Sequence, residues 1–388
     1  MYLLKNISAL TFGLLLIAMG ILCNSCISEY EADIENEPEL ISIEASLIKG
    51  EEEQTVRVSR TATLAHSRFM PVEGCNVSLV DELDNEYPYT ENMRGIYSRS
   101  IPDEELIDGR YYKIRVITTE GEVYESDFER INPGIEVDTV YYAIEDKADL
   151  LTGEPYSGIQ FYLDVEARED ESRYFRWRLE ETYEYTSLGP ISYYYMTEDL
   201  EPIFPEDEWG LFRCWLKEDV EGLFQSSTMN LTLNEKKKIP LNYVSNQTER
   251  LRIKYSLLVN QYTISEDAYE YFEQNRIATE ESGGMYTQQP RQPITNFHNV
   301  DFEGERVLGY FWVSTKTSVR IFVPKIEDME VERVQCSYWE FDPEADGGGP
   351  FPMFIYEDKE AGNKLLSTSS CVDCTKRGGK TSRPDYWE

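Results

Sequence analysis

The amino-acid sequence predicts an all-β protein, in which a smaller N-terminal β-sandwich precedes a larger β-sandwich or barrel-like domain with one short helix. Many short segments alternate apolar and polar side chains, which is the period of two of a half-buried strand. These segments follow one another closely, with turn residues rather than helical periods between them. The 388-residue chain is also 13% aromatic and holds 28 tyrosines, a residue type that suits strands.

The smaller sandwich is predicted at residues 40–131. Apolar and polar side chains alternate over residues 41–47 and again over residues 112–116. The sequence Asn-Pro-Gly at residues 132–134 then breaks the pattern, as a turn between domains does. We therefore expect the first domain to end near residue 131.

The larger domain is predicted at residues 135–388 and carries longer alternating segments. Residues 159–167 predict a long strand, and so do residues 175–179, where apolar positions alternate with two arginines. Residues 307–323 predict a hairpin whose turn is formed by residues 315–318.

One helix is predicted directly after Ser265, whose side chain can cap the first turn. Glu266 and Asp267 suit the positive end of the helix dipole. Ala268 and Phe272 are four residues apart and would share the buried face.

The first 25 residues predict a lipoprotein signal peptide. Lys5 supplies a positive charge before residues 7–22, an almost wholly apolar stretch that is shorter than the roughly 20 residues of a membrane-spanning helix. Ser25 and Cys26 then resemble a lipobox, in which a small residue precedes the cysteine that is diacylated. We predict lipidation of Cys26, and the alternatives are an uncleaved anchor or an ordinary secreted protein.

Residues 26–39 predict an acidic tether. Six acidic residues and no basic one fall between residues 29 and 39, and their mutual repulsion favours an extended, solvated segment. The whole chain has a net charge of −36, which argues against a nucleic-acid partner and against docking on anionic lipid. Lipid on Cys26 would therefore have to attach the protein to its membrane.

The chain holds seven cysteines. Cys23 would leave with the signal peptide, Cys26 would take lipid, and Cys75 is interpreted as a small buried residue. Four disulfide candidates remain in the larger domain: Cys214, Cys336, Cys371 and Cys374. Disulfides persist outside the cytoplasm, and four cysteines allow three pairings. A redox pair or a zinc site at residues 371–374 stays open as an alternative.

A partial calcium-loop pattern occurs near the C-terminus. Asp342, Glu344 and Asp346 stand at alternate positions before Gly347, a spacing that lets successive oxygens face one cation. The twelfth position is Met353, however, where a calcium loop needs a bidentate glutamate. A flexible acidic loop is the simpler interpretation, and apart from this calcium candidate we predict no metal and no cofactor.

No catalytic residues are predicted, and we interpret the protein as a non-enzyme. His66 and His298 are the two histidines of the chain, and most hydrolases need a histidine as base or ligand. Neither Gly-x-Ser-x-Gly nor His-Glu-x-x-His occurs. Catalysis by a carboxylate pair stays formally open. A chain with 73 acidic residues always brings some of them close together, however, so a close pair is no evidence for it.

Aromatic side chains could build a ligand-binding platform. The candidates are Tyr193, Tyr194, Tyr195, Trp209, Trp215, Trp312 and Trp339. The alternative interpretation, that they fill sheet cores and edges, is favoured because strands commonly carry aromatic residues.

Two parts of the N-terminal half resemble known families. Residues 71–79, 95–97 and 111–118 look like the carboxypeptidase-regulatory or transthyretin-like module, which is a small Ig-like sandwich. The acidic tether is similar to the signal that follows the lipidated cysteine in surface-exposed lipoproteins of the Bacteroidetes.

A series of motifs extends along the whole mature chain. After the lipobox these are Arg213-Cys214-Trp215, Gln289-Pro290, Asn296-Phe297, Val307-Leu308-Gly309-Tyr310-Phe311, Cys371-Val372-Asp373-Cys374 and Pro384-Asp385-Tyr386-Trp387. Their order resembles the Bacteroidetes lipoprotein family catalogued as domain of unknown function 4249 (DUF4249), and the C-terminal run is the most specific part of the resemblance.

The resemblance implies a function but supplies no ligand and no catalytic residues. Members of the family tend to sit beside TonB-dependent receptors of the outer membrane. It therefore implies a surface-exposed outer-membrane lipoprotein that is the accessory ligand-binding partner of a TonB-dependent nutrient transporter. The alternative is a cell-surface adhesin or structural lipoprotein without a transport role, and a hydrolase of unfamiliar type comes third.

Overall fold

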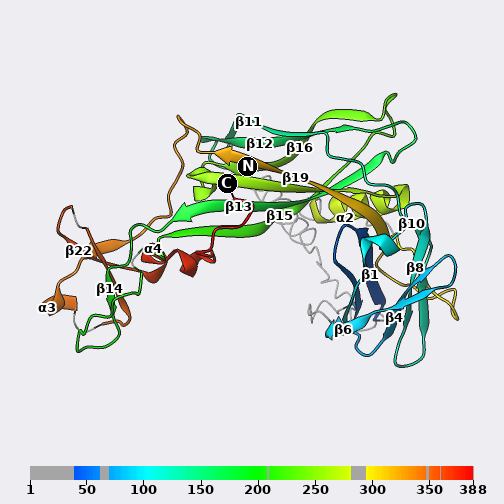
Figure 1. Ribbon diagram of the computed structural model, residues 1–388, viewed down its shortest axis with the longest axis horizontal. Coiled ribbons are helices and arrows are strands. Elements are labelled where there is room, and N and C mark those ends of the chain that lie inside the picture. Colours follow the sequence, from blue (N-terminus) through cyan, green and yellow to red (C-terminus); the bar gives the residue numbers. More distant parts are fainter. Residues whose placement is uncertain are drawn as a thin grey trace, which may run out of the picture. The chain divides into compact units, whose positions relative to one another are not determined.

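The computed structural model describes residues 39–61, 70–207, 209–280, 294–346, 349–358 and 360–387. Strands make up most of the regular structure (Figure 1), which confirms the predicted all-β class. Within these ranges the strands form four open sheets, and packed apolar clusters hold them together. His66 and Cys26, together with the signal peptide and nearly all of the tether, lie outside the described residues.

The largest sheet joins strands from both ends of the sequence. In order, its strands are β15 (Arg213–Ser227), β13 (Tyr174–Thr186), β17 (Lys254–Thr263), β19 (Phe311–Pro324), β1 (Ile41–Lys49), β2 (Glu53–Arg60), β7 (Ile96–Ser100) and β6 (Thr90–Met93), and β3 (Met70–Pro71) pairs with β2. The junction is the parallel pairing of β1 with β19, and its neighbours are antiparallel. One sheet therefore runs across the predicted boundary at residue 131, although the domain limits themselves stay a prediction.

The predicted hairpin at residues 307–323 is wrong, because β19 is one continuous strand. Its first half pairs with β1 as far as Thr315, and its second half pairs with β17 from Lys316 onward. The proposed turn, Thr-Lys-Thr-Ser, contains no glycine, proline, asparagine or aspartate, and β-branched threonine favours an extended backbone. The hydroxyl groups of Thr315 and Thr317 instead donate to the carbonyl oxygens of Asn132 and Ile135 over 2.7 Å each.

The second sheet packs on the β1–β2–β7 side of the first. Its strands in order are β18 (Phe297–Asn299), β9 (Val123–Ser126), β8 (Tyr111–Ile117), β4 (Asn76–Asp81) and β5 (Glu86–Pro88), and β10 (Glu129–Arg130) pairs with β8. The shared core contains Ile43, Val56 and Ile114, whose burial confirms the alternation seen in the sequence. It also takes in Phe297 and Phe311 from much later in the chain. A short 3-10 helix, η2 (Asp103–Glu105), lies between β7 and β8.

The third sheet packs on the β13–β17 side of the first. It consists of β11 (Thr139–Ala148), β12 (Pro155–Glu166) and β16 (Glu235–Ser245) in that order, and η3 (Glu249–Leu251) follows β16. Phe161 of β12, Trp177 of β13 and Tyr255 of β17 are buried in one apolar cluster. The long strand predicted at residues 159–167 is confirmed, since its apolar positions face this cluster.

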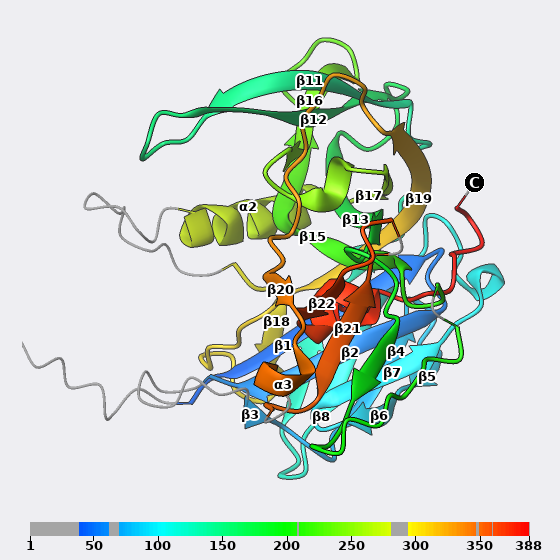
Figure 2. The ribbon, with the colours of Figure 1, turned by 90° about the vertical axis from the view of Figure 1, so that its left-hand side faces the viewer.

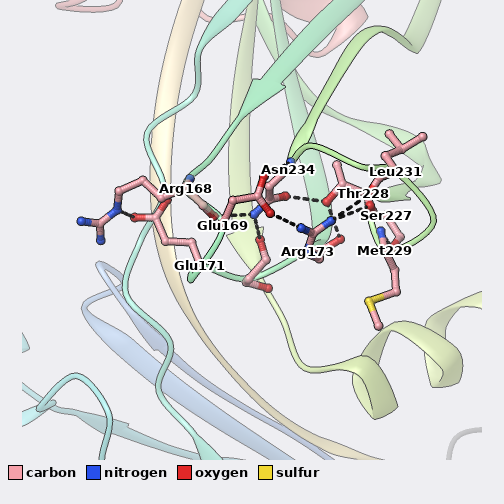
Figure 3. Close-up of polar contacts among 10 residues, drawn as sticks. Arg168, Glu169, Glu171, Arg173, Ser227, Thr228, Met229, Leu231 and Asn234 are labelled. Carbon is pink, nitrogen blue, oxygen red and sulfur yellow. Dashed lines mark hydrogen bonds and ion pairs between the residues drawn. The ribbon is translucent and has the colours of Figure 1, made fainter.

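A polar clasp, which we define as Arg173, Thr228 and Asn234, ties the loop before β13 to the loop after β15 (Figure 3). The buried Asn234 amide donates to the carbonyl oxygens of Arg168 and Ser172 over 2.8 and 3.2 Å, and its oxygen accepts from Thr228. Arg173 donates to the carbonyl oxygen of Thr228 over 3.1 Å. The clasp holds the two loops together just before β13 begins at residue 174.

The fourth sheet is small and lies near the C-terminus. Its strands in order are β14 (Tyr193–Tyr195), β21 (Met353–Glu357), β22 (Lys364–Ser367) and β20 (Tyr338–Glu340), and it is accompanied by α3 (Pro343–Asp346), α4 (Ser369–Val372) and η4 (Cys374–Arg377). Tyr193 and Tyr195 are buried in its core with Phe341 and Ile355. Strand β21 pairs with β14 on one side and with β22 on the other.

The predicted helix is present as α2 (Glu266–Glu280), which packs against β13 and β15. The hydroxyl oxygen of Ser265 accepts from the backbone N–H of Ala268 over 3.2 Å, which confirms the cap. Ala268 and Phe272 are buried together with Trp312 of β19. The helix therefore covers the face of the first sheet opposite the third sheet.

Candidate ligand-binding site

A cavity of about 450 Å³ lies where α2 meets strands β1, β2, β13 and β19. We call it the arginine–aromatic pocket, and its defining residues are Arg176, Arg178, Tyr271, Phe272, Tyr310 and Trp312. Its volume falls in the range of sites that take small organic ligands, roughly 300–1,000 Å³.

The period of two in β13 places the arginines in this pocket. Phe175 and Trp177 point into the core shared with the third sheet. Arg176 and Arg178 must then point to the opposite face, where α2 and β19 lie. The same alternation that marks the strand in the sequence therefore puts two cations on one wall.

Arg176 is the deepest charged group of the pocket. Its guanidinium carbon lies 3.5 Å from the ring centroid of Phe272 and 5.4 Å from that of Trp312, so both rings engage the cation. Burial lowers the pKa of Arg176 to about 9, and the neighbouring charge of Arg178 acts in the same direction. At neutral pH the guanidinium group keeps its charge.

No carboxylate in the described part of the chain forms an ion pair with Arg176, and its buried Nη1 has no hydrogen-bond partner there. Arg178 is more exposed, and its guanidinium carbon lies 5.5 Å from the ring centroid of Tyr262. A buried donor without a partner costs free energy, about 1–3 kcal/mol and more when it is charged. An anionic ligand would supply the missing acceptor.

Strands β1 and β2 and the turn between them add carboxylates to the pocket. Glu51 accepts from the Tyr262 hydroxyl over 2.9 Å and lies 3.7 Å from the Lys316 amine, and Glu53 accepts from the Ser98 hydroxyl. Glu44 is exposed at the rim. The arrangement fits a ligand whose flat anionic end reaches Arg176 and whose other end donates hydrogen bonds.

A close backbone contact positions Tyr310 in the wall. The N–H of Ile43 donates to the carbonyl oxygen of Leu308 over 2.9 Å, and the N–H of Ala45 donates to that of Tyr310 over 3.1 Å. Gly309 lies between them with φ of +93°, and a Cβ atom there would come within 2.0 Å of the Ile43 carbonyl oxygen. A glycine is therefore required at this position.

The four candidate cysteines form two disulfides. Cys214 of β15 is bonded to Cys374 of η4, and Cys336 is bonded to Cys371 of α4. The two cysteines of the Cys-x-x-Cys motif thus have different partners, an arrangement that the sequence left open. Cys75 is free and half-buried.

The calcium candidates lie in and next to α3 instead of a loop. Asp342 accepts from the backbone N–H of Glu344 over 2.9 Å, and Asp346 accepts from that of Asp342 over 3.0 Å. These carboxylates therefore bond the local backbone. Within the described ranges, no group of three or more histidine, cysteine, aspartate or glutamate side chains is arranged to hold a metal ion.

The structure does not bring the candidate aromatic residues together. Tyr193 and Tyr195 lie in the core of the fourth sheet, Trp339 is exposed on strand β20 of that sheet, and Trp209 is exposed before β15. Trp312 alone lines the arginine–aromatic pocket. His298 is exposed in β18, with its Nδ1 atom 4.0 Å from Asp127.

Sequence reasoning missed Arg176 and Arg178 as site residues. Their alternation with Phe175 and Trp177 was visible and showed that they face away from the core. The unusual feature, a pair of cations two positions apart beside an aromatic helix face, is recognisable only once α2 is placed on β13.

Comparisons with known proteins identify the family. The chain matches the family described as "Domain of unknown function (DUF4249)" over residues 27–320. The C-terminal run from Cys371 to Trp387, which was expected to be the most specific part of the resemblance, lies outside the matched residues. No curated protein matches the chain.

One similar solved structure is described as the crystal structure of trypsin activated alpha-2-macroglobulin from Escherichia coli, with 8% identity and a TM-score of 0.19 over 62% of this chain. The chain spans 16% of the length of that protein. In the described ranges, no helix is long and apolar enough to cross a membrane. Because the family match covers well over half of its residues, the protein belongs to the DUF4249 family.

Proposed function

We propose that the protein is a surface-exposed, lipid-anchored outer-membrane lipoprotein that binds an anionic ligand in the arginine–aromatic pocket without catalysing a reaction. In this proposal it is the accessory partner of a TonB-dependent nutrient transporter in a bacterium of the Bacteroidetes. Cys26 carries the lipid, residues 26–39 form the tether, and the N-terminal sandwich is a transthyretin-like module. Three observations support this cellular location: the predicted signal peptide, the acidic charge pattern after Cys26, and membership of the family.

The observation that carries ligand binding is the buried guanidinium of Arg176. Its Nη1 has no partner in the described residues, although the pocket beside it is large enough for a small organic molecule. Phe272 and Trp312 offer faces on which a planar ligand can stack. A carboxylate on such a ligand would complete the hydrogen bonding of Arg176.

Isothermal titration calorimetry with 2-naphthoate tests this site, because the probe is planar and anionic. We expect saturable binding that Arg176→Gln weakens by at least about tenfold, the worth of one charge-assisted hydrogen bond. The neutral 2-naphthamide should bind the unaltered protein no more tightly than 2-naphthoate binds the Arg176→Gln variant. Arg168→Gln is the matched control, since Arg168 is exposed with 74% of its side-chain surface accessible.

Two results would count against the site. Equal affinity for 2-naphthoate and 2-naphthamide would show that charge plays no part in recognition. Equal losses in Arg176→Gln and Arg168→Gln would show that any change in net charge has the same effect. Thermal unfolding of each variant establishes that a loss of binding does not come from unfolding.

Affinity purification from detergent-solubilised outer membranes tests the partner. The tagged protein should recover a TonB-dependent barrel in stoichiometric amount, identified by mass spectrometry. The Cys26→Ala form should recover none, because it lacks the lipid that brings it to the same membrane. Recovery of the tagged protein alone would argue against a stable transporter complex.

Adhesion is a second candidate function, which the tip of the β11–β12 hairpin supports. Leu150 is 100% exposed and Leu151 is 96% exposed, and Figure 2 shows the hairpin extending beyond β16. Asp149 accepts hydrogen bonds from the backbone of Leu151 and Thr152, which holds the two leucines outward. Changing both leucines to serine should abolish attachment of the cells to the surface on which they grow. Ile144→Ser on the same hairpin is the control.

A further inference from the structure

A second and smaller cavity lies at the opposite end of β13 from Arg176. Its volume is about 60 Å³, and we call it the C-terminal cavity. Thr186, the last residue of β13, lines it together with Glu249 of η3 and Arg377 of η4. The Cys336–Cys371 disulfide forms another part of the wall.

Arg377 is held rigidly in this wall. Its Nη1 forms an ion pair with Glu249, and its Nη2 donates to the carbonyl oxygen of Thr186 over 2.7 Å. The ring of Tyr185 lies 4.3 Å from its guanidinium carbon. The remaining donor, Nε, is buried and has no partner in the described part of the chain.

Two further arginines line the cavity, Arg252 and Arg333. Burial lowers the pKa of Arg252, and the charge of Arg333 lowers it further, so the two guanidinium groups repel one another. Neither forms an ion pair with a described carboxylate, and Glu249 is the only acidic side chain among the described residues of the lining. Three cations thus face one anion inside a protein whose net charge is −36.

This imbalance calls for an anion. Guanidinium groups bind oxyanions through paired N–H donors in a planar arrangement, and they do so best when partly shielded from water. The cavity offers several times the roughly 10–15 Å³ that a cavity needs in order to hold one water molecule. It is therefore large enough for a single phosphate or sulfate group and too small for a larger organic molecule.

We propose that Arg252, Arg333 and Arg377 form a binding site for one tetrahedral oxyanion, either as a free ion or as the terminal group of a larger molecule. The site is separate from the arginine–aromatic pocket and does not depend on the function proposed for that pocket. Ser370 of α4 is also in the lining, where its hydroxyl group lies 3.1 Å from the hydroxyl oxygen of Thr368.

The Cys336–Cys371 disulfide should help to hold this site together. Arg333 lies three residues before Cys336, and Ser370 directly precedes Cys371. The bond therefore fixes the segment that carries Arg333 against α4. Without it, the guanidinium of Arg333 would be free to leave the cavity, and the affinity for the anion would fall.

Calorimetric titration of the purified full chain with inorganic phosphate in a chloride-free buffer tests the proposal. We expect saturable binding that Arg333→Gln weakens by at least about fivefold, and that Arg333→Lys restores in part because it keeps the charge. Arg168→Gln should bind phosphate as the unaltered protein does, because Arg168 is exposed and lies outside both cavities. Replacing Cys336 and Cys371 by serine should weaken binding without removing an arginine.

Absence of saturable binding at phosphate or sulfate concentrations up to about 20 mM, a very weak affinity, would overturn the proposal. An equal loss in Arg168→Gln would also overturn it, because binding would then reflect net charge alone. Glucose 1-phosphate distinguishes the two sources of the anion. Affinity similar to that of phosphate indicates an open site for a terminal group, and affinity for phosphate alone indicates a closed site for the free ion.

Discussion

The arginine–aromatic pocket and the C-terminal cavity stabilise positive charge in different ways, although β13 contributes to both. Near its start, Arg176 lies against the faces of Phe272 and Trp312 with no described carboxylate partner. At its end, Arg377 also lies over an aromatic ring, that of Tyr185, but in addition has a carboxylate and a carbonyl oxygen as partners. Aromatic faces leave the donors of a guanidinium group unused, whereas a carboxylate occupies them.

The difference determines what each region can bind. The first has about 450 Å³ and flat walls, which suit a planar organic anion. The second has about 60 Å³ and three arginines in its lining, which suit a single oxyanion. Half-buried arginines near the two ends of β13 therefore indicate ligands of two chemical classes in the same molecule.

Of the changes considered, loss of the Cys214–Cys374 disulfide should have the largest effect, and it should weaken ligand binding in the C-terminal cavity but not in the arginine–aromatic pocket. The bond closes a loop of 160 residues, and its removal by Cys214→Ser and Cys374→Ser should lower the free energy of unfolding by about 5 kcal/mol on the chain-entropy model. Under native conditions phosphate binding should fall, because Cys374 begins the helix η4 that carries Arg377. Urea unfolding and calorimetry measure the two effects, and unchanged affinity for 2-naphthoate is the internal control.

Asn234→Ala should weaken ligand binding in the arginine–aromatic pocket, because it removes one member of the polar clasp. Asn234 is buried, and its amide bonds the carbonyl oxygens of Arg168 and Ser172, which would lose a donor. We expect the free energy of unfolding to fall by roughly 2–3 kcal/mol. Affinity for 2-naphthoate should also fall, because the start of β13 loses its anchor. Chemical denaturation of Asn234→Ala measures the loss of stability. Asn363→Ala, at an exposed position, is the control. Equal stability of the two variants would contradict the role of the clasp.

Arg176→Met should stabilise the ligand-free protein. Methionine fills a similar volume between Phe272 and Trp312 without a buried charge, and such replacements raise stability by about 1–2 kcal/mol in favourable cases. The change costs the cation–π contacts, so the gain is smaller than the cost of the unpaired donor alone. Thermal unfolding with and without 2-naphthoate checks this. The variant should have the higher unfolding temperature without the probe, and adding 2-naphthoate should not raise that temperature further. A lower unfolding temperature would show that Arg176 stabilises the fold.

The smallest expected effect concerns Glu129, which accepts from the hydroxyl of Tyr310 in the pocket wall over 2.8 Å. Burial raises the pKa of Glu129 above its ordinary value of 4.5. The protonated form is therefore favoured in the fold, and the stability it contributes is lost as the pH rises through the raised pKa. Glu129→Gln keeps an acceptor for Tyr310 and should remove this loss. We expect the free energy of unfolding at neutral pH to rise by less than about 1 kcal/mol.

Stability curves across pH 4 to 8, roughly the range in which buried carboxyl groups titrate, compare Glu129→Gln with the unaltered protein. Glu104→Gln, at an exposed position, is the control. Parallel curves for Glu129→Gln and the unaltered protein would contradict a raised pKa at this site.

The local patterns of the sequence were reliable where one face of an element is buried. Alternation placed Ile43, Phe161 and Trp177 in cores, and Ser265 was recognised as the cap of α2. Each of these features depends on neighbours within a few residues. The hairpin predicted at residues 307–323 failed because alternation shows which way side chains point but not where a strand ends.

By itself, the sequence determined the all-β class, the position of the helix, the two faces of β13 and the set of cysteines available for disulfides. Tertiary structure alone decided that β1 pairs in parallel with β19, that Cys374 bonds Cys214, and that Phe272 and Trp312 cover Arg176. The reason is physical. Period and propensity arise from adjacent residues, whereas strand order, disulfide pairing and pockets depend on contacts between residues far apart in the sequence, such as Cys214 and Cys374 at a separation of 160 positions.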